Sequence, residues 1–282
     1  MGDGKRAQVA LVTGAAKGLG KSMVLGLIGA GFRVAAVDRD RESLEDLRAT
    51  VEADGQAGQC EPFVEDLCDF DAQALVSRIV QKMGAIDILI NNAGLGQAQV
   101  RDDYHRNPVK FYEVTPQVWK NAINVNATAV FLLSQAIAPS MIKAGWGRII
   151  NITTSLGTML RGGYCPYGPT KASAEGLSAV MAADLHGTGV TVNVLIPGGV
   201  VNTPMIPSGA PFRREDLLQP DEMVAPLLWL VSEDANHMTG QRFLATKWSA
   251  SMTPRDAAAS AGAPIGWKDI AVLPVTPAFV KN

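Results

Sequence analysis

The pentapeptide Tyr167-Gly168-Pro169-Thr170-Lys171 places a phenol and an ammonium four residues apart. Residues at this spacing share one face of a helix, so Tyr167 and Lys171 are expected to be neighbours. A lysine beside a phenol would lower the phenol pKa from its usual value of about 10 and make the phenol a usable acid or base. Tyr167 alone among the four tyrosines has a lysine at this position. Taken by itself, the pair would be better explained as an incidental surface contact.

Two polar residues elsewhere in the chain strengthen the catalytic interpretation. Thr154 precedes Tyr167 by thirteen residues, at the end of the predicted strand RIINITTS, and Ser155 follows it. Successive side chains on a strand point to opposite faces, so we expect Thr154 and not Ser155 to face the site. Asn126 lies in a predicted core helix, where its amide must find hydrogen-bond partners. A helix kink or a backbone cap explains Asn126 equally well.

The segment TGAAKGLG (residues 13–20) follows a predicted strand and opens a predicted helix. Glycines in this context let the backbone turn tightly and approach a pyrophosphate at the helix N-terminus, although an ordinary strand–helix turn has the same pattern. Asp38 ends the next predicted strand, where a carboxylate accepts a hydrogen bond from a ribose 2′-hydroxyl and repels a 2′-phosphate. Lys17 and Arg39 could instead pair with that phosphate. Because the carboxylate opposes the phosphate directly, we predict NAD over NADP.

Short apolar runs alternate with helix-period segments along the chain. Several runs are continuously apolar, as in strands covered on both faces. Strands are predicted at residues 9–13, 32–37, 59–64, 86–90, 148–153, 190–196 and 242–245, and helices at 18–30, 41–54, 69–83, 116–144, 164–186 and 220–231. This alternation predicts an α/β fold with a doubly wound parallel sheet in three layers and a single domain.

Three segments interrupt the alternation: residues 95–115, residues 204–219 and the tail 247–282. Long loops in compact domains are commonly functional, so substrate contacts are expected there. We predict a catalytic domain over residues 7–246 and a C-terminal extension over residues 247–282. The extension is expected to bury Trp248 or Trp267 against the substrate region or a neighbouring subunit.

Composition excludes several functional classes. With 25 Lys and Arg against 27 Asp and Glu, the net charge is −2, so neither nucleic acid nor an anionic membrane is an expected partner. Cys60, Cys68 and Cys165 are odd in number and scattered, which suits a reducing compartment. No CxxC or HExxH pattern occurs among only three His, so no metal site is expected. The N-terminus lacks signal-peptide features, and residues 121–142 are too polar for a membrane span, so a cytoplasmic protein is expected.

The chain resembles the single-domain short-chain dehydrogenase/reductase family over about residues 7–245. The resemblance rests on motifs in family order: TGAAKGLG, the strand-end Asp38, Asp66-Leu67, NNAG, NVNATAVF, NITTS, YGPTK and PGGVVNTPM. Asp66-Leu67 and NNAG are weak singly, since helix capping and ordinary turns explain them. The resemblance implies a Rossmann-type sheet, a nicotinamide cofactor and alcohol/carbonyl oxidoreduction.

Roles for individual residues also follow from the resemblance. Tyr167 corresponds to the acid/base, Lys171 to the group that tunes it and holds the nicotinamide ribose, and Asn126 to a residue that positions Lys171 through water. Thr154 stands where the family usually has serine. The implied cofactor contacts are Gly14, Lys17, Gly18, Leu19, Gly20, Asp38, Arg39, Asp66, Leu67, Asn92, Ala93, Gly94, Tyr167, Lys171, Pro197, Gly198, Val200 and Thr203.

Two further features depart from the family pattern. The segment after Pro197-Gly198 is one residue longer than usual, which weakens the assignment of Thr203. The last predicted strand leads into Ala245-Thr246 instead of the common Asp-Gly-Gly ending.

The leading functional hypothesis is NAD-dependent interconversion of a secondary alcohol and a ketone, with small molecules as substrates. A non-catalytic NAD-binding regulator is less favoured, because it would be expected to lose the Tyr, Lys and Asn set. An NAD-dependent epimerase or dehydratase generally carries a separate substrate domain, for which little chain remains. The two longest predicted helices are apolar all round, and with the family resemblance this predicts a homodimer or homotetramer. Basic loop residues could read a carboxylate or phosphate on the substrate, but pairing with Asp102, Asp103 and Glu215 is the favoured interpretation. These basic residues are Arg101, His105, Arg106, Arg161, Arg213 and Arg214.

Overall fold

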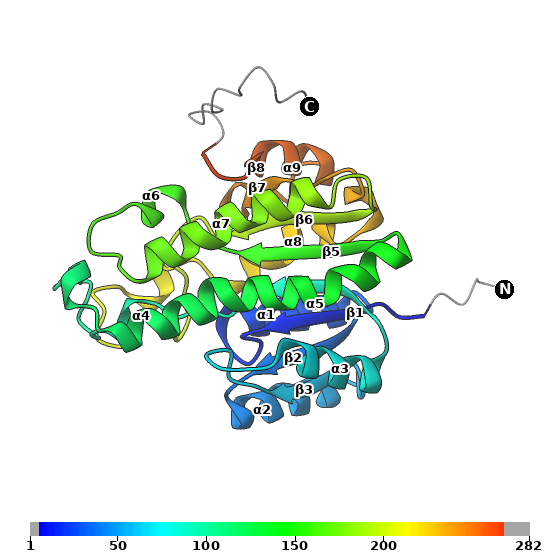
Figure 1. Cartoon of the computed structure of the whole chain (residues 1–282), viewed down its shortest axis with the longest axis horizontal. Helices are drawn as coiled ribbons and strands as arrows, with labels where there is room; N and C mark the ends of the chain where they lie inside the picture. The colour runs from blue at the N-terminus through cyan, green and yellow to red at the C-terminus, as the bar shows by residue number, and fades with distance from the viewer. Residues whose placement is uncertain (1–5, 268–282) are drawn as a thin grey trace, which may run out of the picture.

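The structure, a computed structural model, describes residues 6–267 of the chain. In this part of the chain one eight-stranded sheet has the order β3-β2-β1-β4-β5-β6-β7-β8, and every neighbouring pair is parallel except β7 and β8 (Figure 1). The strands are β1 Val9–Thr13, β2 Arg33–Asp38, β3 Cys60–Val64, β4 Ile86–Asn91, β5 Gly147–Ile152, β6 Val190–Ile196, β7 Gln241–Leu244 and β8 Gly262–Pro264. The predicted doubly wound, Rossmann-type sheet is confirmed.

Helices cover both faces of this sheet and complete the three layers. They are α1 Gly18–Gly29, α2 Arg41–Ala53, α3 Ala72–Met83, α4 Pro116–Ile123, α5 Ala129–Ala144, α6 Leu156–Met159, α7 Tyr167–Asp184, α8 Val224–Leu230 and α9 Pro254–Ala261. Helices α1, α2 and α8 pack on one face, and α3, α5 and α7 pack on the other. In Figure 1, α5 and α7 lie side by side in front of the sheet.

Alternation along β1 explains how one sheet serves two cores. Ala10 and Val12 join the cluster beneath α1, whereas Val9 and Leu11 join the cluster beneath α3 and α5. All four side chains are fully buried, so the strand reads as a continuous apolar run.

The structure revises the boundaries of several predicted elements. The predicted helix over residues 116–144 is two α-helices joined by a π-helical turn, Asn124–Thr128, and α7 begins at Tyr167 because the preceding residues form a separate loop. Strand β5 ends at Ile152, so Thr153 and Thr154 lie beyond the ladder. No helix or strand was predicted in the tail, but its described part contains α9 and the edge strand β8.

The chain from Pro116 to Ala144 is apolar and long enough to cross a membrane by length and composition alone. Half of its most apolar window is buried inside the structure, and α5 packs against β4 and β5. This stretch therefore forms part of the core layer.

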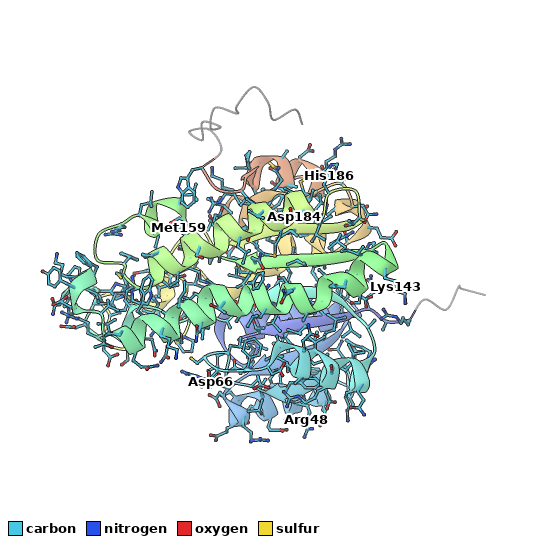
Figure 2. All side chains as sticks on the ribbon, in the orientation of Figure 1. Arg48, Asp66, Lys143, Met159, Asp184 and His186 are labelled. Atoms are coloured by element: carbon cyan, nitrogen blue, oxygen red, sulfur yellow. The ribbon has the colours of Figure 1, made fainter. Side chains whose placement is uncertain are left out.

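The order of the strands reverses between β1 and β4, and this is where an open α/β sheet forms a crevice at its carboxyl edge. Asp66 and Met159 lie toward this edge in Figure 2, whereas Lys143 and Asp184 lie toward the opposite edge. The loops that follow β4, β5 and β6 all start at the carboxyl edge, so the predicted site residues are brought to one side of the molecule.

Candidate active site

Tyr167 opens α7 and meets the hydroxyl of Thr154, which lies two residues beyond β5. Burial raises the pKa of the Tyr167 phenol to about 12, and a hydrogen bond with the Thr154 side chain acts in the opposite direction. The neighbouring Ser155 Oγ lies 2.7 Å from Thr158 Oγ1 in α6. The two adjacent hydroxyls thus have different partners, and the one at position 154 contacts the phenol.

Lys171 lies one helical turn after Tyr167 and is 3% exposed. Its Nζ donates a hydrogen bond of 2.7 Å to the carbonyl of Ile152, and burial lowers the pKa of the ammonium to about 8. The Nζ atom lies 6.0 Å from the centre of the Tyr167 ring. The lowering of the phenol pKa that was expected from Lys171 does not dominate, because burial of the phenol raises that pKa.

Asn126 is fully buried inside the π-helical turn. Its Oδ1 accepts from the Leu95 amide at 2.7 Å, and its Nδ2 donates to the Leu95 carbonyl at 3.0 Å and to Thr170 Oγ1 at 2.8 Å. The amide therefore caps the chain after β4, and π-helical turns of this kind are frequent at functional sites. Positioning of Lys171 through water stays a prediction.

The glycine-rich turn leaves no room for side chains. Gly14 and Gly18 have φ values of +61° and +53°, and a Cβ on Gly20 would lie 1.9 Å from the Gly14 carbonyl oxygen. At its three glycines the turn therefore packs closely against the Gly14 carbonyl, Ala93 and Thr203, and with the N-terminus of α1 it forms a cradle of backbone. Such a cradle fits a pyrophosphate.

Thr13 fastens this turn to the segment after β4, a role that the sequence analysis missed. Its Oγ1 accepts hydrogen bonds from the amides of Asn92 and Ala93 at 3.0 and 3.1 Å. Asn92 Nδ2 in turn donates to the carbonyls of Thr13 and Gly14 at 2.9 and 3.0 Å. The signal was present in the sequence, since a polar Thr ends an otherwise apolar strand.

A pocket opens beside this fastening at the carboxyl ends of β1 to β4. Its lining residues are Gly14, Val37, Asp38, Arg39, Glu65, Asp66, Leu67, Ala93, Gly94, Leu95 and Val125. The position and the glycine cradle match what a dinucleotide needs, so the residues present fit a nicotinamide cofactor.

Acidic groups dominate the end of β2. Asp38 accepts hydrogen bonds from the Ala16 and Asp40 amides, both at 3.1 Å, which fixes its carboxylate beside the glycine-rich turn. Lys17 Nζ lies 2.6 Å from Asp40 Oδ2. The lysine that could favour a 2′-phosphate is thus already paired, while Arg39 is exposed at the pocket.

The remaining residues that were predicted to contact the cofactor lie in several different surroundings. Leu19 packs against the core cluster beneath α1. Gly198 lies against the Thr246 side chain, the carbonyl of Val200 accepts from the Leu218 amide, and the Thr203 side chain touches Gly18. Asp66 Oδ1 accepts from the Cys68 amide beside the pocket.

Three loops contact one another near the start of α7. Val109 pairs with Tyr164, Gly96 lies against Met205, and the His105 ring contacts Phe212 edge-on at 4.8 Å. These contacts bring residues 95–115 and residues 204–219 together, and contact of these loops with a substrate stays a prediction.

Most of the loop arginines have partners on the protein. Arg101 pairs with Glu113, Arg213 pairs with Asp216 and Glu215, and Arg214 donates to the carbonyls of Thr203 and Ile206. The expected partners Asp102 and Asp103 are not used by these arginines. Arg161 lies over the ring of Tyr164 at 5.1 Å.

Comparison with known proteins places the chain in a family. The family model described as short chain dehydrogenase matches residues 8–211. The chain belongs to the short-chain dehydrogenase family. A 3-oxoacyl-acyl-carrier-protein reductase of Thermotoga maritima is 33% identical over 83% of this chain and 94% of its own length. A D-threitol dehydrogenase of Mycolicibacterium smegmatis is 32% identical over 84% of this chain and 90% of its own length.

Solved structures of the family agree with this fold. A putative short chain dehydrogenase of Shigella flexneri, crystallised with NADP, is 28% identical and superposes with a TM-score of 0.75 over 85% of this chain and 97% of its own. A putative NAD(P)-dependent gluconate 5-dehydrogenase of Beutenbergia cavernae, also with NADP, is 28% identical with a TM-score of 0.72 over 84% of this chain and 94% of its own. The chain is therefore an oxidoreductase of this family with a nucleotide cofactor.

Proposed function

We propose that this short-chain dehydrogenase interconverts a secondary alcohol and a ketone, with NAD as its cofactor. The observation that carries the proposal is the contact between the Tyr167 phenol and the Thr154 hydroxyl at the carboxyl edge of the sheet. Two hydroxyl donors that converge on one point suit a single carbonyl or alkoxide oxygen.

Tyr167 would exchange a proton with the substrate oxygen at its phenol oxygen. Thr154 would donate a hydrogen bond to the same oxygen and stabilise negative charge that develops on it. Lys171 would hold the nicotinamide ribose, and its burial one turn from Tyr167 places a cation near the phenol. When bound, the nicotinamide supplies a hydride acceptor or donor.

The preference for NAD rests on the charges around the second strand. Asp38 is held beside the glycine-rich turn, where its carboxylate would meet an adenosine ribose. Asp40 neutralises Lys17. Together these groups disfavour a 2′-phosphate, although the two solved relatives described above contain NADP.

The test is a panel of secondary alcohols and ketones, including polyols and 3-oxoacyl thioesters, assayed in both directions by nicotinamide absorbance. Turnover by the wild type that is lost in Tyr167→Phe, with cofactor binding retained, is the expected result. Absence of turnover across the panel with either cofactor would contradict the proposal.

A further inference from the structure

Behind the catalytic hydroxyls lies an ion pair that the proposed chemistry does not use. Glu175 of α7 is fully buried and Arg242 of β7 is 6% exposed, with Arg242 Nε 2.9 Å from Glu175 Oε1. Removing two charges from water is costly unless hydrogen bonds satisfy both groups. The hydrogen-bond partners of Glu175 and Arg242 therefore indicate which part of the structure this ion pair supports.

Both charged groups reach the segment that leaves β5. Glu175 Oε2 accepts a hydrogen bond of 2.8 Å from Thr153 Oγ1, and Arg242 Nη2 donates one of 3.0 Å to the carbonyl of Thr154. Strand β5 ends at Ile152, so the ladder no longer fixes these two residues. The ion pair supplies the hydrogen bonds that hold this segment.

Helix α7 organises the segment from one face. Tyr167, Lys171 and Glu175 follow one another at four-residue spacing and so lie along the same side of the helix. Lys171 binds the carbonyl of Ile152, and Glu175 binds the hydroxyl of Thr153. The Thr153 side chain is thus bonded to Glu175 and the Thr154 carbonyl to Arg242. Held in this way, the segment presents the Thr154 hydroxyl to Tyr167.

The tail closes the same cluster. The Gly266 amide donates a 3.0 Å hydrogen bond to Glu175 Oε1, and Ile265 is buried against Val194 and Ile196 of β6. The chain just after β8 thus covers the ion pair and adds a second hydrogen bond to Oε1, the oxygen that Arg242 contacts.

We propose that Arg242 and Glu175 are positioning residues that set the Thr154 hydroxyl against Tyr167, and that the chain after β8 completes this support. The inference rests on the proposed function, since the hydroxyl matters for turnover only if Thr154 and Tyr167 act on one substrate oxygen.

The test is a double-mutant cycle between Arg242→Lys and Thr154→Ala. Lysine can still neutralise Glu175 but lacks the planar fork that reaches the Thr154 carbonyl as well. We expect Arg242→Lys to lower kcat about tenfold, and the double variant to lose about as much as Thr154→Ala alone, near 10²-fold, because coupled sites are not additive. The KM for NAD should not change.

Arg148→Lys is the matched control. Arg148 is fully buried at the opposite end of β5 and donates to the carbonyls of Gly147 and Ser232. The variant Arg148→Lys should have a lower Tm than the wild type but the same kcat. Unchanged kcat in Arg242→Lys, or losses that multiply in the double variant, would overturn the proposal.

Hydrogen exchange provides a readout that does not depend on activity. Arg242→Lys should speed exchange of amides in residues 153–159, and Arg148→Lys should not. If the wild type turned over no substrate, the proposed function would fail, and equal exchange in the two variants would separately refute the positioning role.

Discussion

Thr154 and Ser155 are adjacent hydroxyls with separate partners, the first at Tyr167 and the second at Thr158. Thr154→Ala should lower kcat by about 10²–10³, the range for losing one donor to a developing oxyanion. Thr154→Ser keeps the donor and should keep most of the activity, whereas Ser155→Ala should have little effect. Steady-state kinetics on the three variants checks this. A crippled Ser155→Ala beside a mild Thr154→Ala would mean that the wrong hydroxyl has been assigned.

The proposed preference for NAD also depends on single residues. The hydrogen bond with Lys17 holds the pKa of Asp40 at about 2, so the carboxylate is charged at neutral pH. Asp40→Asn should release Lys17 and raise kcat/KM for NADP relative to NAD, and Asp38→Ala should shrink the NAD preference further by removing repulsion of the 2′-phosphate.

Kinetics with both cofactors measures these shifts. Asp40 also caps α2 by accepting from the Ser43 amide, so Asp71→Asn, at the equivalent cap of α3, is the control. A wild type that prefers NADP would contradict the assignment and show that Lys17 and Arg39 prevail.

At the scale of elements, the π-helical turn fixes the start of the loop after β4. Asn126→Asp keeps the acceptor for the Leu95 amide but loses both donors, to the Leu95 carbonyl and to Thr170. We expect lower kcat and faster hydrogen exchange around Leu95 than in the wild type. Unchanged exchange would show that the Asn126 amide does not hold this loop.

The sequence predicted the sheet well because apolar runs and glycine turns are local signals. It predicted the Tyr167, Lys171 and Thr154 cluster because spacing on a helix and a strand end determines which side chains meet. It left a helix kink at Asn126 as one explanation but did not place the break at residues 124–128, since a π-helical turn has no period of its own in the sequence. The partnership of Glu175 with Arg242 joins residues far apart in the chain, and only tertiary structure brings them together.

The end of the sheet was missed for a related reason. Residues 262–264 are Gly, Ala and Pro, which have little strand propensity, and their pairing with β7 depends on an available edge. Trp248 or Trp267 was expected to be buried against the substrate region or a neighbouring subunit, and Trp248 packs on Trp229 of α8, with ring centres 5.6 Å apart. Trp267 lies just after this edge strand.

For the whole molecule, α5 and α7 expose apolar side chains on the same layer. Phe131 is 44% exposed and Val180 56% exposed. We expect this layer to form the interface of a homodimer or homotetramer, so Val180→Arg should reduce the oligomer mass measured by light scattering. Val80→Arg, at a residue of similar exposure on α3, is the control. A monomeric wild type would refute the prediction.

Stability should respond to pH through Lys171. Burial lowers its pKa from 10.5 to about 8, so between these values the folded protein binds fewer protons than the unfolded chain. The titration of Lys171 therefore makes the wild type more stable as pH rises from 8 to 10.5. Below pH 8 the folded protein carries the full cost of burying the charged ammonium. The pKa of Tyr167 is raised, so its contribution is lost only above pH 10.

Lys171→Met removes this titration. The unfolding free energy of the wild type, relative to that of the variant, should increase between pH 7 and pH 10, as measured by chemical denaturation. A constant difference across this range would mean that the ammonium is not desolvated in the folded protein.

The two hydrogen bonds between Asn126 and Leu95 have a consequence for how such a protein acquires new substrates. Before Leu95 the chain serves the nucleotide pocket, and after it the chain runs out over the substrate side. Because the junction is fixed from α7 and the π-helical turn, we expect an exchange of residues 96–115 to leave the chain before Leu95 in place. We therefore expect evolution, or a protein engineer, to be able to change this loop while the nucleotide pocket is kept.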